Sequence, residues 1–90
     1  MKLMELTRSI HSLDPEQTIY AQKPWNCESE VEVFTEPQDG AVPKDLSDDY
    51  EYFLEVFIAQ EVVPDLSHVE PSLTLESWCI RLIDYAENDA

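Results

Sequence analysis

The stretch DLSDDYEYFLEVFIAQEVV, residues 45–63, decides the fold that the sequence predicts. Counted from Tyr50, apolar side chains recur at the third, fourth, seventh and eighth positions, which is the spacing of a buried helical face. These positions hold Phe53, Leu54, Phe57 and Ile58. Because further apolar side chains widen that face, the pattern predicts a central helix over residues 47–63 that other elements cover on several sides.

The residues at the two ends of this stretch fit the boundaries of a helix. Serine is a good N-cap residue, so Ser47 is expected to cap the helix, and the helix dipole favours the carboxylates that follow it. Pro64 is expected to end the helix, because proline cannot continue the hydrogen-bond ladder. The narrow exposed strip of the helix would then carry Asp48, Glu51 and Glu55.

The flanking segments predict the rest of a small α+β domain. Apolar residues at helical spacing predict one amphipathic helix over residues 3–13 and another over residues 73–86. The segments TIYAQ and EVEVFT have the composition and alternation of paired strands, which predicts an antiparallel hairpin over residues 18–35. Since a hairpin alone is marginally stable, it must lie against helices. We therefore expect a single domain over residues 1–90 in the order α-β-β-α-α, with three helices packed on a two-stranded antiparallel hairpin.

The charge of the chain is strongly negative and restricts its partners. Twenty acidic residues face five basic ones, giving a net charge of −15, although a hydrophobic fraction of 43% favours a folded chain over a disordered one. Such a charge repels nucleic acid and anionic membranes and attracts cationic partners within a Debye length of about 8–10 Å. No run is as long as a membrane span, and charges at Lys2, Glu5 and Arg8 interrupt any signal-peptide core, so we expect a cytoplasmic protein.

The sequence predicts no catalytic site, metal site or cofactor. Cys27 and Cys79 are expected to be free thiols that pack as small hydrophobic side chains, with an enzyme using Cys27 or Glu61 as an alternative. A zinc site needs four ligands in closely spaced pairs, and His11 and His68 form no such pair with each other or with the cysteines. The acid-rich start of the central helix lacks the glycine and the closing glutamate of a calcium-binding EF-hand loop.

The acidic surface is the best candidate for a binding site. Carboxylates one helical turn apart lie ~5–6 Å from each other, close enough to engage neighbouring lysine or arginine side chains of a basic protein. The predicted partner-binding residues are Asp48, Glu51 and Glu55 on the central helix, Glu30 and Glu32 on the hairpin, and Trp25 as an aromatic anchor. Two alternatives stay open: the charge serves solubility alone, and Trp25 plugs the open end of the core.

Three segments carry a resemblance to a known group of proteins. TIYAQKPW, DYEYFLEVFIAQE and RLIDYAENDA resemble segments of short acidic bacterial proteins in a domain family of unknown function. In size and charge the chain is also similar to bacterial toxin-immunity proteins and phage-encoded anti-CRISPR inhibitors, which occupy basic surfaces of nucleases or nucleic-acid-binding complexes. The resemblance implies a non-enzymatic inhibitor or immunity-type protein with a basic partner. The alternative is a domain that is acidic for solubility and acts as a homodimer or a complex subunit.

Overall fold

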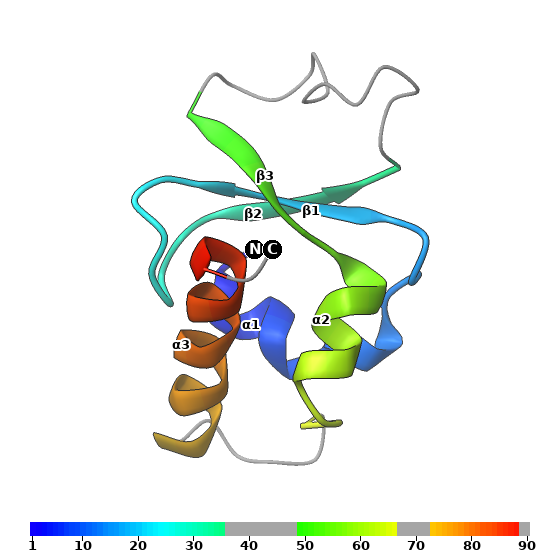
Figure 1. Cartoon of the computed structure of the whole chain (residues 1–90), viewed down its shortest axis with the longest axis vertical. Helices are drawn as coiled ribbons and strands as arrows, with labels where there is room; N and C mark the ends of the chain where they lie inside the picture. The colour runs from blue at the N-terminus through cyan, green and yellow to red at the C-terminus, as the bar shows by residue number, and fades with distance from the viewer. Residues whose placement is uncertain (36–48, 67–72, 89–90) are drawn as a thin grey trace.

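The computed structural model describes residues 1–35, 49–66 and 73–88. The described elements are, in chain order, α1 (Leu3–Arg8), the 3-10 helix η1 (Ile10–Ser12), β1 (Thr18–Gln22), β2 (Val31–Phe34), β3 (Tyr50–Glu55), α2 (Val56–Val62) and α3 (Leu73–Asn88). The strands form one antiparallel sheet in the order β2-β1-β3, and the three helices lie on one side of it (Figure 1). The fold is therefore α+β, as predicted, but the described sheet has three strands in place of two.

The prediction of a central helix over residues 47–63 is wrong. Within this range, Tyr50–Glu55 forms the strand β3, which runs antiparallel to β1 and pairs Tyr50 with Gln22. Only Val56–Val62 forms a helix. Without β3, one edge of β1 would leave its N–H and C=O groups unpaired inside the molecule, so the extended conformation is favoured over the helical one. Ser47, the predicted cap, lies outside the described residues.

A β-bulge explains why the sequence of this strand has apolar residues at the spacing of a helix. Ile19 pairs with Leu54 but Tyr20 pairs with Tyr52, so Phe53 is an extra residue in β3. The extra residue brings Phe53 and Leu54, two successive side chains, to the helix side of the sheet, where both are buried. The bulge breaks the alternation that identifies a strand and leaves apolar residues at helical spacing.

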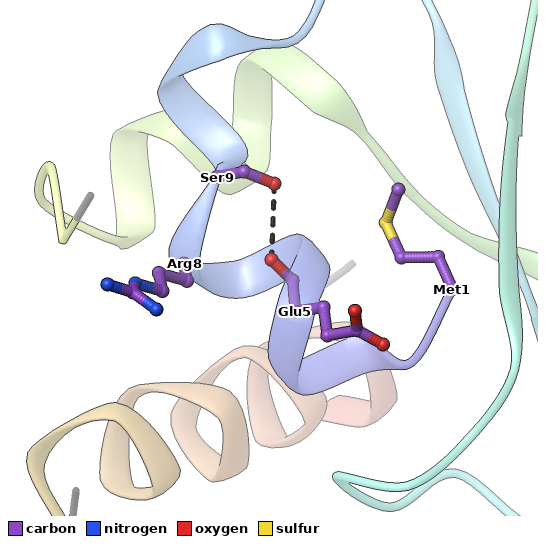
Figure 2. A pocket seen from close by; sticks show the side chains of 4 residues that line it. All are labelled: Met1, Glu5, Arg8 and Ser9. Carbon is purple, nitrogen blue, oxygen red and sulfur yellow. Dashed lines mark hydrogen bonds between the residues drawn. The ribbon is translucent and has the colours of Figure 1, made fainter. Parts of the chain in front are cut away.

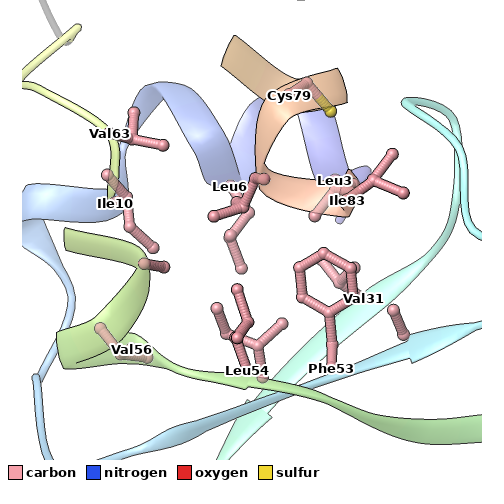
Figure 3. Packing of buried hydrophobic residues seen from close by; sticks show 14 of the residues in the cluster. Leu3, Leu6, Ile10, Val31, Phe53, Leu54, Val56, Val63, Cys79 and Ile83 are labelled. Atoms are coloured by element: carbon pink, nitrogen blue, oxygen red, sulfur yellow. The ribbon is translucent and has the colours of Figure 1, made fainter. Parts of the chain in front are cut away.

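The core fills the space between the sheet and the helices. Phe53 and Leu54 point from β3 toward Leu3 and Leu6 of α1 and toward Ile83 of α3 (Figure 3). The first four of these side chains are at most 1% exposed, and Ile83 is 9% exposed. Full burial of an aliphatic or phenylalanine side chain stabilises a fold by about 1.5–3 kcal/mol, so this cluster holds the sheet against α1 and α3.

The first helix is shorter than the predicted range of residues 3–13. α1 stops before Ser9, whose backbone N–H donates to the carbonyls of both Glu5 and Leu6, and the chain continues as η1. The Ser9 hydroxyl also donates to the Glu5 carbonyl at 3.1 Å. Serine side chains that bond to nearby carbonyls compete with regular helical geometry. Ile10 is nevertheless buried, so the predicted apolar stripe is kept although the helix changes type.

The hairpin and the last helix follow the sequence prediction closely. β1 and β2 pair antiparallel with Ala21 opposite Val31, so the predicted hairpin over residues 18–35 is present. The last helix was expected over residues 73–86 and extends to Asn88. The Asn88 side-chain amide donates to the Asp84 carbonyl at 3.1 Å and to its carboxylate at 2.8 Å. Both bonds hold the Asn88 side chain against the last turn of α3.

Candidate partner-binding surface

The structure does not place Glu51 and Glu55 on one helical face. Both lie on β3, where four residues span about 13 Å. The bulge between them sends the two side chains to opposite faces of the sheet, and Glu55 lies opposite Thr18 of β1. Glu51 forms an ion pair with Lys23, with 3.5 Å between Oε2 and Nζ. The helical cluster predicted for these acids is therefore wrong, and its third member, Asp48, lies outside the described residues.

The two predicted acids of the hairpin differ in their surroundings. Glu30 accepts a hydrogen bond from the terminal amine of Met1 at 3.1 Å and forms an ion pair with Lys2 at 3.2 Å. The bond from the terminal amine, followed by the one from Lys2, lowers the pKa of the Glu30 carboxyl. Glu32, two residues further along the chain, is exposed. Glu30 is therefore engaged within the molecule, whereas Glu32 faces solvent.

The sheet face opposite the helices combines carboxylates with tyrosines. Strand pairing places Glu32 opposite Tyr20, and Tyr20 opposite Tyr52, so these side chains share one face. Tyr52 is 40% exposed, while Tyr20 is buried. The strand periodicity and the bulge add Tyr50 and Glu55 to the same face. The outer sheet face is defined here as Glu32, Tyr50, Tyr52 and Glu55.

Negative charge converges on one end of this face. Burial raises the pKa of the Tyr50 hydroxyl, and the carboxylates of Glu32, Glu30 and Asp49 raise it further. A neighbouring negative charge disfavours the tyrosinate anion, so the shift reports the local potential. Carboxylates on and just before β2, together with one just before β3, thus lie near Tyr50 although they are distant in the sequence.

Trp25 closes one end of the core, as the alternative prediction proposed. Its ring packs edge-on against Phe53 with 4.9 Å between centroids, and its indole N–H donates to the Ala21 carbonyl at 3.2 Å. The Lys23 ammonium lies 4.7 Å from the centroid of the indole ring. Trp25 is only half-buried, however, so part of its ring stays available to a partner.

A hollow of about 560 Å³ lies between the β1–β2 loop and α3. Four of its lining residues are large apolar side chains, which we call its floor: Met4, Trp25, Ile80 and Ile83. Two exposed carboxylates, Glu28 and Glu76, also line it and are called its rim, and Asn26 and Cys27 complete the lining. We call it the α3 groove. Ile80 is 54% exposed, which is unusual for a large aliphatic side chain. The sequence prediction missed this groove, although Ile80 gave a signal because it falls outside the apolar face expected for the last helix.

The loop that forms one wall of the α3 groove is held by its own hydrogen bonds. The Ser29 hydroxyl accepts from the Asn26 backbone N–H at 2.9 Å and donates to the Pro24 carbonyl at 3.0 Å. The Met4 backbone N–H donates to the Cys27 carbonyl at 3.1 Å and so ties the loop to α1. These bonds fix the loop wall before any partner arrives.

The cysteines and Glu61 provide little that catalysis could use. Cys79 is fully buried, and burial, followed by a hydrogen bond with Cys27, raises the pKa of its thiol to about 12. A thiol with that pKa stays protonated at neutral pH and is a poor nucleophile. Cys27 is partly buried, and neither cysteine forms a disulfide. Glu61 of α2 is exposed.

A second hollow, of about 370 Å³, lies beside α1 and is lined by Met1, Glu5, Arg8 and Ser9 (Figure 2). Two of its polar side chains, Glu5 and Ser9, already form hydrogen bonds with backbone groups at α1. The Glu5 carboxylate accepts from the Lys2 N–H at 3.0 Å, and the Ser9 hydroxyl donates to the Glu5 carbonyl (Figure 2). The α3 groove, with its exposed apolar floor, is the better candidate for binding.

In the described ranges, no three histidine, cysteine or carboxylate side chains converge as metal ligands do. No helix there has the length and apolar character needed to cross a bilayer. Comparison with models of protein families, with curated proteins and with solved structures found no match, so the predicted family resemblance stays a prediction.

Proposed function

We propose that this chain is a non-enzymatic binding module whose outer sheet face docks on a basic surface of a protein that handles nucleic acid. The observation that carries the proposal is the convergence of carboxylates around Tyr50, in a chain with a net charge of −15. Surfaces that bind phosphate groups present clustered lysine and arginine, and the same side chains form charge-assisted hydrogen bonds with carboxylates. A chain docked there excludes nucleic acid, which is the action of an inhibitor or an immunity-type protein.

The tyrosines of the outer sheet face add contact area to this charge. Tyr52 is 40% exposed and Tyr50 is half-buried, and both share the outer sheet face with Glu32 and Glu55. Tyrosine is enriched among the residues that dominate the energy of protein interfaces. The carboxylates would set the rate and orientation of association, and the tyrosines would extend the lifetime of the complex.

A second candidate function, self-association of an acidic domain, has a separate basis. Phe57 and Ile80 are 46% and 54% exposed, and exposed apolar side chains are often buried in dimers. Two copies that each carry a charge of −15 repel each other, so dimerisation should strengthen as salt is added. A complex with a basic partner should instead weaken with added salt, and sedimentation at low and high salt separates the two.

The direct test starts from the partner captured from cells by the immobilised chain and identified by mass spectrometry. Replacing Glu32 and Glu55 with lysine is expected to slow association with that partner about tenfold and to flatten its salt dependence. The matched control replaces Glu61 and Glu87, which are exposed on α2 and α3, with lysine. Equal slowing by both pairs would show that net charge, rather than the outer sheet face, drives binding, and no slowing by either would contradict the proposal.

A competition assay tests the inhibitory role. The chain should displace nucleic acid from the captured partner, and the variant with lysine at positions 32 and 55 should do so about tenfold less effectively. A partner that binds the chain and nucleic acid simultaneously would contradict an inhibitor of this kind.

A further inference from the structure

The α3 groove has a composition that selects its occupant: an apolar floor inside an acidic rim. We infer that it seats an apolar side chain of a lysine- or arginine-bearing segment of a protein partner. The inference rests on the proposed function, because it assumes a basic protein partner, but it concerns a different surface. The volume of the α3 groove, about 560 Å³, lies within the range of sites that bury a small ligand or several side chains.

The apolar part of the groove is exposed in the free chain. Ile80 is 54% exposed, whereas its neighbour Ile83 is 9% exposed and belongs to the core. A side chain that enters the groove would therefore cover Ile80 and rest on a floor that the core already supports. Removing this apolar surface from water favours binding.

The Trp25 side of the floor and the loop wall of the groove are fixed before binding. Trp25 is held by its edge-on packing against Phe53 and by its hydrogen bond to Ala21. The loop that follows Trp25 is tied to α1 through the hydrogen bond from Met4 to Cys27. A preorganised site loses little conformational entropy on binding, so even a single anchoring side chain can be held there.

The rim attracts positive charge. Glu28 projects from the loop and Glu76 from α3, and both are exposed; among the residues that the structure describes, no basic side chain lines the groove. The basic side chains on the described parts of these two elements already have contacts. Lys23 pairs with Glu51, and its ammonium also lies 4.7 Å from the ring centroid of Trp25, which lines the groove. The Arg81 guanidinium lies 5.7 Å from the ring centroid of Trp78.

The same charge disfavours the other occupants of an apolar groove. A second copy of the chain would bring another net charge of −15, and a symmetric contact would set like-charged rims against each other. An acidic or neutral segment would gain nothing from Glu28 and Glu76. A basic segment with an apolar side chain matches both the floor and the rim.

The test uses defined peptides and the full chain. The probe is a short amphipathic peptide of leucine and lysine; its two counterparts carry serine in place of leucine, or glutamate in place of lysine. Binding is followed by NMR at the methyl groups of Ile80 and Ile83 and at the indole N–H of Trp25. The leucine–lysine peptide should shift these signals, the serine–lysine peptide should occupy the groove at least about tenfold more weakly, and the leucine–glutamate peptide should leave the signals unchanged.

Variants separate the floor from the rim. Ile80→Ser should raise the Kd of the leucine–lysine peptide about tenfold. Phe57→Ser, which removes a comparably exposed apolar side chain from α2, should not change it. Replacing Glu28 and Glu76 with glutamine should raise the Kd of the same peptide. Replacing Glu16 and Glu87, which are exposed acids outside the groove, with glutamine should not change it.

The outcomes distinguish this inference from the proposed function. Equal affinities of the leucine–lysine and serine–lysine peptides, with shifts confined to the outer sheet face, would overturn the groove and leave the proposed function standing. Absence of shifts in the groove, or equal effects of Ile80→Ser and Phe57→Ser, would also overturn it. Groove binding of the peptide, combined with a captured partner that ignores changes on the outer sheet face, would support the groove and contradict the proposed docking face.

Discussion

The two halves of residues 50–62 are both rich in apolar and aromatic side chains but form different secondary structures. Tyr50–Glu55 is a strand, and Val56–Val62 is a helix. The strand half lies along β1, whose edge it pairs. At the start of the helical half the Val56 N–H donates to the Gln17 carbonyl at 2.9 Å, and the chain then leaves the sheet. An apolar-rich segment whose periodicity fits both a strand and a helix thus adopts the one for which its surroundings provide backbone hydrogen-bond partners.

Phe53 and Phe57 show the consequence for single residues. They are four positions apart and would share one face of a continuous helix. In the structure Phe53 is 1% exposed and contacts Trp25, whereas Phe57 is 46% exposed. The same residue type is therefore a core residue in the strand half and a surface residue in the helical half.

The largest expected effect is the difference in stability lost when Phe53 and Phe57 are each replaced by alanine. Phe53→Ala should lower the free energy of unfolding by about 3–5 kcal/mol, because it removes a buried ring and leaves a cavity beneath Trp25. Phe57→Ala should change it by less than about 1 kcal/mol. Urea denaturation followed by circular dichroism measures both. Similar losses for the two variants would favour a continuous helix and contradict the strand assignment.

A smaller effect tests how the helical half is held. The Gln60 side-chain amide donates to the carbonyls of Ile10 and Leu13 at 3.0 and 3.1 Å. Gln60→Ala should lower the free energy of unfolding by about 1–2 kcal/mol, since two partly buried hydrogen bonds are lost. The neighbouring exposed Glu61 is the control, and Glu61→Ala should change stability by no more than about 0.5 kcal/mol. An equal effect of both variants would show that α2 does not dock on η1 through Gln60.

The smallest expected effect is a change in the pKa of Tyr50, which tests whether residues 50–55 lie in the sheet near β2. The pKa of Tyr50 is raised above 10.0 by burial and by Glu32, a neighbour that only the pairing of β3 and β2 with β1 provides. Glu32→Gln should therefore move this pKa back toward 10.0, and Glu61→Gln should not. Alkaline titration of tyrosinate absorbance measures the shift, and Tyr50→Phe identifies the transition.

The sign of the linked stability change follows from the direction of that shift. Since the pKa of Tyr50 is higher in the folded chain, its stabilising contribution is complete below pH 10.0 and is lost as the pH rises through the folded pKa. Glu32→Gln should reduce this alkaline loss. A Tyr50 transition at the same pH in the wild type and in Glu32→Gln would contradict the neighbouring positions of β2 and β3.

The candidate site was predictable only where it depends on one element. The alternation of EVEVFT correctly predicted a strand with one buried and one exposed side, since Val31 is buried and Glu32 is exposed. The α3 groove joins Trp25 to Ile80, which are distant in the chain, so the position of Ile80 outside the apolar face of its helix could not by itself reveal the groove. The ion pair of Glu30 with the terminal amine likewise depends on the N-terminal residues crossing to β2.

The sequence by itself determined the α+β class, the antiparallel hairpin, the last helix and the excess of negative charge, because these follow from composition and from patterns within single segments. Only the tertiary structure decided that residues 50–55 form a strand and that the carboxylates lie on separate surfaces. The physical reason is the unpaired edge of β1: backbone groups buried at that edge require hydrogen-bond partners, and β3 supplies them through a bulge that hides the strand pattern.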